Sequence, residues 1–280
     1  MTAAPSDGWH VASGSRIICP FPATATGRFP DGRPPSVAGL CADKMQTKAA
    51  EHIPSRTLEL MACAPRYHRW IVAAFDRYIR PPIIEVGCGL GSITELLLDY
   101  GPVTATDIEE DYLEAVRAKF QGRNDLTVAR LDLLDATVWE GEGFATAVSV
   151  NVLEHIEDDR AALTRIQGLL TPGGHLVLQV PALPALFGPI DVNQGHHRRY
   201  TKKELALKLE RAGFVPVKIH YKNLLGVAGW FVNSRLLRRD ILPARQVLLF
   251  DRLVPMLAFL ERLLSPPLGM ALVAVARKEP

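Results

Sequence analysis

Ile83-Ile84-Glu85-Val86-Gly87-Cys88-Gly89-Leu90-Gly91 is the stretch that decides the fold of this 280-residue chain. A short β-branched run ends in an acid and then in three glycines at alternate positions, and residues 92–98 continue with helical periodicity. The pattern predicts a strand, a tight turn and a helix, an arrangement in which the backbone approaches a bound nucleotide-like ligand. Glycine permits that approach because it has no Cβ and tolerates positive φ values.

The glycines allow two other interpretations. They could form an ordinary turn, or they could be the dinucleotide fingerprint G-x-G-x-x-G/A, which has glycine or alanine where this chain has Ser92. Because Gly91 stands one residue early, the spacing favours the first motif of class I S-adenosylmethionine (SAM)-dependent methyltransferases, which this stretch resembles. The resemblance implies a cofactor contact from Glu85, Gly87, Cys88, Gly89 and Gly91.

The next βα unit supplies an acid for the cofactor. Residues 103–106 predict a second strand, and Asp107 ends it about 20 residues past the first glycine, where an acid accepts hydrogen bonds from ribose hydroxyls in either cofactor class. The alternative for Asp107 is a solvated surface acid. A helix at 110–120 and a strand at 126–130 follow. The resemblance carries recognition of the adenine onto Asp132, with Ile108 and Leu133 beside the ring.

The fourth unit separates the two cofactor classes. Residues 144–150 read as a buried strand, and the string VNVLEHIEDD that begins at Val150 resembles the methyltransferases' fourth motif, which places Asn151 and Val152 beside the sulfonium and the acceptor. A short-chain oxidoreductase would need Tyr-x-x-x-Lys, and no tyrosine here has a lysine four residues on. A helix at 159–170, a Thr-Pro-Gly-Gly turn and a strand at 175–180 complete the match, which covers about residues 66–220.

The resemblance therefore implies an α/β fold: a Rossmann-like seven-stranded sheet, mostly parallel with the last strand antiparallel, and helices on both faces. Residues 1–42 read as a flexible arm and residues 43–280 as the methyltransferase domain, with N-terminal helices that include one at 67–78. Residues 222–269 form a helical apolar insertion before the last strand. In it, one helical face carries Phe250, Leu253, Val254, Leu257, Leu260 and Leu264. This face could be a lid, an oligomer contact, core packing or a membrane-surface contact.

The catalytic candidates come from two segments at the expected ligand edge of the sheet. A general base is needed only if the acceptor loses a proton, and histidine suits that task near neutral pH. His155 is the first candidate, with the alternative that it only orients its loop. The second candidates, His196, His197 and Tyr200, lie in a D-x-x-x-G-H-x-R-R-Y-T pattern that also resembles bacterial small-molecule methyltransferases.

That second segment allows other interpretations as well. Thr201 with Glu204 predicts a capping box for a helix at 202–212, and the neighbouring Arg198 and Arg199 read as a solvated helix start. Histidines near Asp191 could suggest a metal, but the spacing is loose and no second carboxylate is close in sequence. We therefore expect no metal.

Composition limits the remaining classes. A net charge of +2 gives no electrostatic case for nucleic acid as a partner. No apolar run reaches the roughly 18 residues of a membrane span and no signal-peptide core is visible, so we expect a soluble cytoplasmic protein without stable membrane insertion.

The expected function is bacterial, SAM-dependent methylation of a hydrophobic small molecule in secondary metabolism, by a chain that could form a homo-oligomer. The alternatives are an isoprenoid or lipid-linked acceptor whose methylation triggers a rearrangement, a SAM-binding protein without transfer activity, and NAD-dependent oxidoreduction.

Overall fold

The computed structural model describes residues 53–135, 143–239 and 242–279. The arm predicted at 1–42 and the helix-compatible residues 43–52 lie outside this described part.

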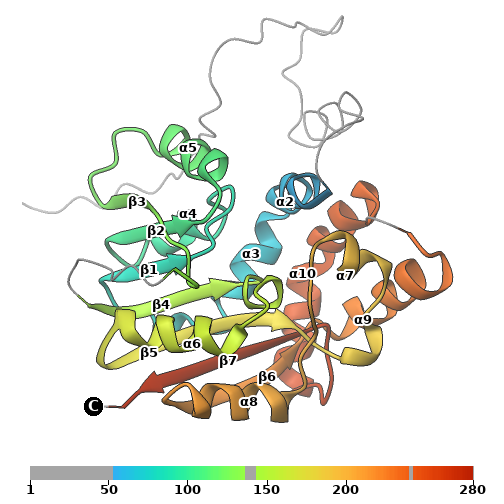
Figure 1. Cartoon of the computed structure of the whole chain (residues 1–280). Helices are drawn as coiled ribbons and strands as arrows, with labels where there is room; N and C mark the ends of the chain where they lie inside the picture. The colour runs from blue at the N-terminus through green and yellow to red at the C-terminus, as the bar shows by residue number, and fades with distance from the viewer. Residues whose placement is uncertain (1–52, 136–142, 240–241, 280) are drawn as a thin grey trace, which may run out of the picture. The chain divides into compact units, whose positions relative to one another are not determined.

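Seven strands form a single mixed sheet (Figure 1). Their order is β3-β2-β1-β4-β5-β7-β6, and only β7 runs antiparallel to its neighbours. The bounds are β1 Ile83–Val86, β2 Val103–Asp107, β3 Leu126–Arg130, β4 Phe144–Val150, β5 Leu170–Pro181, β6 Phe214–Lys222 and β7 Ala271–Lys278. This is the Rossmann-like sheet that the motifs predict. The strand order reverses between β1 and β4, and ligands of open α/β sheets bind at such a switch point.

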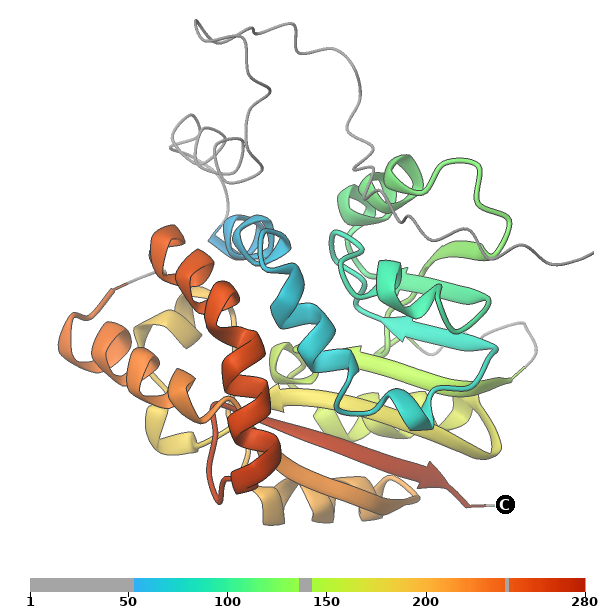
Figure 2. The ribbon, with the colours of Figure 1, turned by 180° about the vertical axis from the view of Figure 1, so that it is seen from behind.

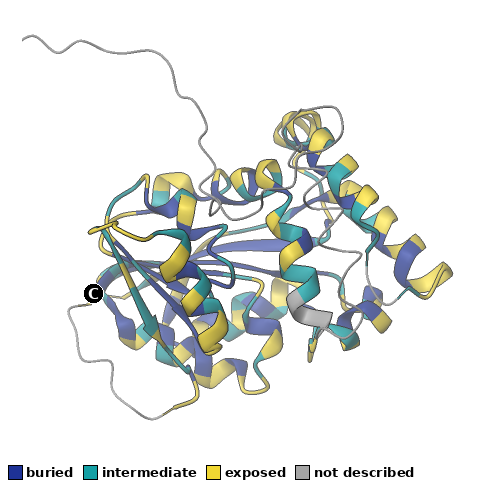
Figure 3. Cartoon of the chain, turned by 90° about the horizontal axis from the view of Figure 1, so that it is seen from above, coloured by how far each residue is buried: buried dark blue, intermediate teal, exposed yellow. Residues whose placement is uncertain are grey.

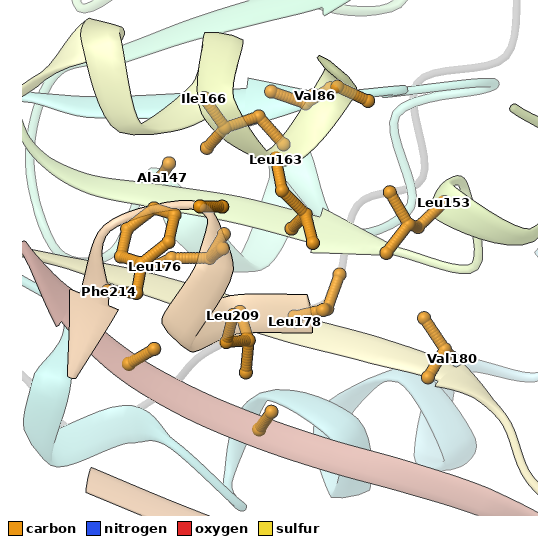
Figure 4. Close-up of a cluster of buried hydrophobic side chains, with 14 of the residues drawn as sticks. Val86, Ala147, Leu153, Leu163, Ile166, Leu176, Leu178, Val180, Leu209 and Phe214 are labelled. Atoms are coloured by element: carbon orange, nitrogen blue, oxygen red, sulfur yellow. The ribbon is translucent and has the colours of Figure 1, made fainter. Parts of the chain in front are cut away.

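Strand alternation builds one core on each face of the sheet. In β5, Leu176, Leu178 and Val180 point to one face, where α6 (Asp159–Leu169) and α8 (Lys202–Arg211) cover them. Figure 4 shows this cluster closing with Leu163, Leu209 and Phe214. Val177 points to the other face and packs with residues of α3 (Pro65–Val72) and α4 (Thr94–Leu97). Figure 3 shows the buried strands between helices whose outer sides are exposed.

The remaining helices are short or lie at the edges of the sheet. They are α2 Ile53–Ala62, α5 Glu110–Lys119, α7 Pro189–Asn193 and the 3₁₀ turns η1 Asp76–Tyr78, η2 Leu153–His155 and η3 Pro184–Leu186. At the start of α8, the Thr201 hydroxyl oxygen accepts from the Glu204 N–H at 3.1 Å, which is the first of the two hydrogen bonds of the predicted capping box.

The helix predicted at 67–78 is wrong at its C-terminal end. It stops at Val72, because the N–H groups of Ala74 and Phe75 bond three residues back and tighten the chain. This tightening buries Phe75 and Ile79 against the sheet before β1 begins.

The segment between β6 and β7 is an antiparallel helical hairpin, formed by α9 (Leu224–Trp230), the π-helical turn η4 (Phe231–Leu236) and α10 (Ala244–Leu264). Near the C-terminal end of α10, the Glu261 carboxylate accepts from the N–H groups of Asn223 and Leu224. At the other end, the Asn233 amide donates to Gln246 Oε1 at 2.9 Å. Figure 2 shows α10 running beside α3.

The apolar face predicted on α10 is wrong toward its C-terminal end. Val247, Asp251 and Val254 are the buried residues, whereas Leu260 and Leu264 are exposed. The hydrophobic pattern misplaces this face because it treats the acid Asp251 as facing solvent. In the structure Asp251 is buried against α3.

Candidate functional site

The glycine turn after β1 has the backbone conformation that its sequence requires. Gly87, Gly89 and Gly91 all have positive φ, at 77°, 48° and 71°. The N–H groups of Gly87 and Cys88 both donate to the Thr106 carbonyl at 2.8 Å, which fastens the turn to β2. A Cβ at Gly87 would collide with the side chain of Val152. The turn and the segment leaving β4 therefore pack against each other.

Glu85 supports this turn from within β1. Its side chain is buried, and the Thr94 hydroxyl donates to Oε2 at 2.5 Å, which ties the strand to α4. Burial raises the pKa of Glu85 to about 8. The carboxyl is thus largely protonated at neutral pH, and its predicted contact with a cofactor stays a prediction.

Asp107 joins the turn to the end of β2. Its Oδ2 accepts from the Gly89 N–H at 2.9 Å, and its Oδ1 accepts from the Glu109 N–H at 3.1 Å. A carboxylate offers about four lone-pair sites, so acceptor capacity remains for a diol. The neighbouring Ile108 side chain is 47% exposed and available to a flat ring.

The segment after β3 lies against the same point. The Leu131 N–H donates to the Asp107 carbonyl at 3.0 Å. Asp132 Oδ1 accepts from the Leu134 N–H at 2.9 Å, and Leu133 is buried. The structure therefore gathers the residues predicted for ribose and adenine at one corner of the sheet. A carboxylate with open lone pairs beside a glycine turn fits the ribose of SAM.

The end of β4 supplies the neighbouring part of the site. Asn151 has a positive φ of 55°, its N–H donates to the Gln179 carbonyl at 2.9 Å, and its Oδ1 accepts from Gln179 Nε2 at 3.4 Å. This strained residue turns the chain at the switch point, directly before Val152 packs on the glycine turn.

Tyr67 is a candidate site residue that the sequence analysis missed. It comes from α3, and burial raises its pKa to about 12. A hydrogen bond with the Gln179 side chain acts to lower that pKa. Gln179 Oε1 is buried without a hydrogen-bond partner among the described residues. No local pattern identifies Tyr67, because it meets Gln179 only through the tertiary fold.

His155 and His196 form a pair at this edge. Their ring centroids lie 4.7 Å apart with an interplanar angle of 82°. Burial first, and then the charge of His196, lower the pKa of His155 to about 4, although part of the residue remains exposed. His155 is therefore neutral at pH 7 and a weak base.

Asp191 orients the second histidine. This fully buried carboxylate faces His196 Nδ1 at 3.0 Å, and it accepts from Arg199 Nε at 2.8 Å and from the Gly188 N–H at 2.9 Å. Burial acts to raise the pKa of Asp191, but the hydrogen bond from His196 and the charge of Arg199 outweigh it, and the pKa is lowered. Since a carboxylate only accepts, Nδ1 of His196 carries a proton.

Other members of the second segment have structural roles. Tyr200 is fully buried and its hydroxyl donates to Asp159 Oδ2 at 3.0 Å. Its hydroxyl is therefore not placed to contact a methyl acceptor. The exposed His197 contributes its backbone N–H to the Glu154 carbonyl at 2.8 Å. Arg199, interpreted as solvated, is 2% exposed and lies over the Trp230 ring at 4.4 Å. That interpretation was wrong because Asp191 and Trp230 together compensate a buried guanidinium.

One group of side chains could hold a metal ion. The ligand atoms of Glu154, His155 and His196 lie within 4.8 Å of one another. Both Glu154 carboxyl oxygens are buried without a hydrogen-bond partner among the described residues, and burial raises the pKa of Glu154 to about 8. A metal would have to displace that proton. The expected absence of a metal stays a prediction.

Comparison with known proteins finds similarity to methyltransferases. A methyltransferase-domain family model matches residues 84–176. An uncharacterized methyltransferase of Mycobacterium tuberculosis (strain ATCC 25618 / H37Rv) is 36% identical over 105 residues, which are 37% of this chain and 52% of that protein. The ubiquinone biosynthesis O-methyltransferase of Dinoroseobacter shibae is 29% identical over 170 residues, 53% of this chain and 68% of that protein. The chain spans about half the length of the first curated relatives it matches.

A solved structure shares the fold. The phosphoethanolamine N-methyltransferase 2 of Haemonchus contortus, in complex with SAM, has a TM-score of 0.55 at 14% identity, covering 86% of this chain and 60% of that chain.

Within the described residues, no helix has both the length and the apolar character to cross a membrane.

Proposed function

We propose that this chain, which carries a methyltransferase domain of the class I SAM-dependent fold, methylates a hydrophobic small molecule with SAM as donor. When bound, SAM supplies an electrophilic methyl group on its sulfonium. The natural acceptor, on this proposal, is a secondary metabolite of a bacterium.

One observation carries the proposal: the residues that we assign to the donor and those that we assign to the acceptor lie together at the β1/β4 switch point. The glycine turn and Asp107 lie on the β1 side, and the His155–His196 pair lies on the β4 side. Val152 packs directly on Gly87 between them. This short connection supports an in-line displacement, in which the acceptor approaches along the line of the breaking bond.

Positioning would supply most of the acceleration. Holding the acceptor close to the methyl carbon in a dry pocket can be worth about 7–11 kcal/mol. On this proposal, Asp107 holds the ribose, Val152 closes the donor side, and Asn151 and Gln179 present polar groups to the acceptor. His196, oriented by Asp191, and the neutral His155 are the groups that could take an acceptor proton.

An aromatic cluster of Tyr67, Trp70 and Phe250, which we call the roof of the site, supports a hydrophobic acceptor. Tyr67 lies edge-on to Trp70, with centroids 6.2 Å apart, and to Phe250 of α10, with centroids 5.7 Å apart. Aromatic side chains beside a few polar groups suit an aromatic or isoprenoid body better than a polar polymer.

Transfer of an isotope-labelled methyl group from SAM tests the proposal. The full chain is incubated with aromatic and isoprenoid alcohols, phenols and amines, and product mass is read by chromatography with mass spectrometry. We expect label in at least one hydrophobic acceptor and none in polar acceptors of the same functional group. Label only in polar acceptors would contradict the acceptor class while leaving methyl transfer intact.

An isoprenoid or lipid-linked acceptor is the second candidate. The exposed apolar side of α10 favours it, since 69% of Phe259 is exposed. The same assay with a polyprenyl acceptor in vesicles distinguishes the two candidates. A product with the mass of one added methyl, but with a retention time and fragmentation unlike those of the simply methylated standard, would reveal a coupled rearrangement, because a rearrangement changes bonds without changing mass.

A further inference from the structure

The helical hairpin α9–η4–α10 exposes an unusual amount of apolar surface. Of 19 exposed large hydrophobic residues in the described part of the chain, 13 lie between Leu224 and Leu268. Phe259 is 69% exposed and Leu263 is 73% exposed. Scattered exposed apolar residues are normal on a protein surface, but a concentration in one element marks an interaction site.

On α10 these residues follow a helical repeat. Intervals of three and four residues place six side chains on one side of the helix: Arg245, Leu249, Arg252, Met256, Phe259 and Leu263. We call this set the outer stripe. The side that packs on the protein is different and includes Val247, which contacts Leu60 and Ala64 near α2. The outer stripe therefore does not close over the sheet as a lid.

The second arm of the hairpin extends the same kind of surface. Phe231 and Leu236 on η4 are 46% and 65% exposed. Glu261 bonds the start of α9 and Gln246 bonds Asn233, so α9 and η4 lie alongside α10 over most of its length. Two helices held side by side, each with exposed apolar residues, can lie flat on a surface.

The charge of the hairpin indicates what that surface is. Residues 222–269 contain seven basic and three acidic residues, a net charge of +4 in a chain whose total is +2. Two of the acids act within the fold: Asp251 bonds Arg66 and the Tyr67 N–H, and Glu261 bonds the start of α9. The arginines of the outer stripe, by contrast, are exposed.

We propose that this hairpin docks on the surface of an anionic phospholipid membrane, with α10 parallel to the membrane plane. Interfacial helices combine large apolar side chains with arginines that pair with lipid phosphates. A second copy of the chain fits less well, because an antiparallel two-fold contact would place Arg245 against Leu263 and Arg252 against Met256, without the anionic partner that lipid phosphates supply. Nucleic acid offers no partner for Leu249, Met256, Phe259 and Leu263.

The docking surface lies one helix away from the candidate site. Val247 of α10 packs on Leu60 of α2, and Leu58 of α2 is the nearest contact for a Cβ at Gly89, at 3.4 Å. A membrane beneath α10 would therefore be close to the roof of the site, which is the geometry for an acceptor that partitions into lipid.

Co-sedimentation of the full chain with vesicles tests the proposal without any measurement of activity. We expect binding to phosphatidylcholine vesicles with about 30 mol % phosphatidylglycerol, and weak binding to pure phosphatidylcholine. Binding should fall about tenfold or more when salt rises to about 1 M, where the Debye length is short. Both results follow from an apolar stripe flanked by arginines.

Two sets of variants assign the binding to the outer stripe. Phe259→Ser combined with Leu263→Ser should lower the fraction bound at least about tenfold, whereas Leu207→Ser, which removes an exposed leucine from α8, should leave it unchanged. Arg245→Gln combined with Arg252→Gln should remove the preference for anionic vesicles, and Arg160→Gln on α6 serves as its control. All are exposed positions, so folding should persist.

Equal binding to neutral and anionic vesicles, or unchanged binding by the Phe259/Leu263 variant, would overturn the proposal. A dimer that this variant converts to a monomer in size-exclusion chromatography would also overturn it, because a second copy would then occupy the stripe.

Discussion

Asp107 links the glycine turn to the ribose position through a single carboxylate. It already accepts from the Gly89 and Glu109 N–H groups, so its orientation is fixed before any ligand arrives. Fixed acceptors lose little conformational entropy on binding, and preorganisation of this kind increases affinity.

The Asp107→Ala variant should bind SAM about 1.5–3 kcal/mol more weakly, because two charge-assisted hydrogen bonds to ribose are lost. That is about a 10- to 150-fold rise in Kd, measurable by calorimetry. Asp99→Ala, at an exposed position, is the matched control and should bind normally. Unchanged affinity in the Asp107 variant would refute the placement of the cofactor.

His155 gives a prediction for the pH dependence of catalysis. If this histidine takes the acceptor proton, His155→Ala should lower kcat about 10²-fold or more with little change in the KM for SAM. Because its pKa is lowered to about 4, it can accept a proton at any pH above that value, and kcat/KM should stay flat from about pH 6 to 8. A fall of kcat/KM below about pH 6.5 would show that another group is the base. A decrease in kcat of less than about tenfold in His155→Ala would mean that positioning alone accounts for catalysis.

At the scale of single residues, the sequence predicted which residues lie at the candidate site better than it predicted what each side chain does there. The glycines, Asp107 and the two histidine segments stand out because their spacing relative to strands is local. Tyr67 and Glu154 do not stand out, since their relevance depends on contacts across the fold. Tyr200 was assigned a catalytic role because nothing local shows that its hydroxyl is bonded to Asp159.

At the scale of elements, α10 stabilises two other helices through its acids. Asp251 accepts from the Tyr67 N–H at 2.9 Å, within the first turn of α3, and Glu261 accepts from two N–H groups at the start of α9. These N–H groups lack intrahelical partners. In α3 the carboxylate replaces a missing local cap, and in α9 it adds to the cap that Asn223 provides for the Gly226 N–H. The added segment is thereby fastened to the roof of the site.

Removal of the first contact should measure how strongly α10 holds α3. Asp251→Ala leaves the Tyr67 N–H without its acceptor and should lower the free energy of unfolding by about 1–3 kcal/mol. Urea unfolding measures this, with the exposed Glu114→Ala on α5 as the control. Asp251→Asn keeps an acceptor oxygen and should lose less. Identical midpoints for Asp251→Ala and the parent chain would show that this contact does not stabilise α3.

Element boundaries followed the sequence where hydrophobic periodicity alone decides them. Strands β3 and β4 begin and end as predicted. For β4 the reason is that a buried parallel strand reads as a mostly apolar run, whereas β3 is an edge strand without buried residues and follows its β-branched residues. The end of α3 and the buried face of α10 were missed. Both depend on tertiary contacts, the packing of Phe75 on the sheet and the burial of Asp251 against α3.

At the scale of the whole molecule, two buried carboxyl groups couple stability to pH. Burial raises the pKa values of Glu85 and Glu154 to about 8, from ordinary values of 4.5. Between these values the folded chain holds protons that the unfolded chain has released. Stability therefore falls as pH rises through this range.

The difference between the parent chain and Glu154→Gln isolates one carboxyl between pH 6.5 and 7.5. His68, His155 and His220 have pKa values lowered to about 4, so the unfolded chain holds their protons longer and they act in the opposite sense in this window, equally in both proteins. In the parent chain the two carboxyls outweigh these histidines, and the free energy of unfolding should fall as pH rises. Glu154→Gln should remove about 1 kcal/mol of the carboxyl contribution over this window in urea titrations. A stability that rises with pH in this window would contradict the burial of neutral carboxyls.

Calorimetric titration of the full chain with SAM, and separately with NADH, tests the central claim most directly. A glycine turn joined to Asp107 at the switch point, with Val152 packed on Gly87, should bind SAM in a saturable one-to-one complex and give no heat with NADH. Saturable binding of NADH, or no binding of SAM by the folded chain, would contradict the account.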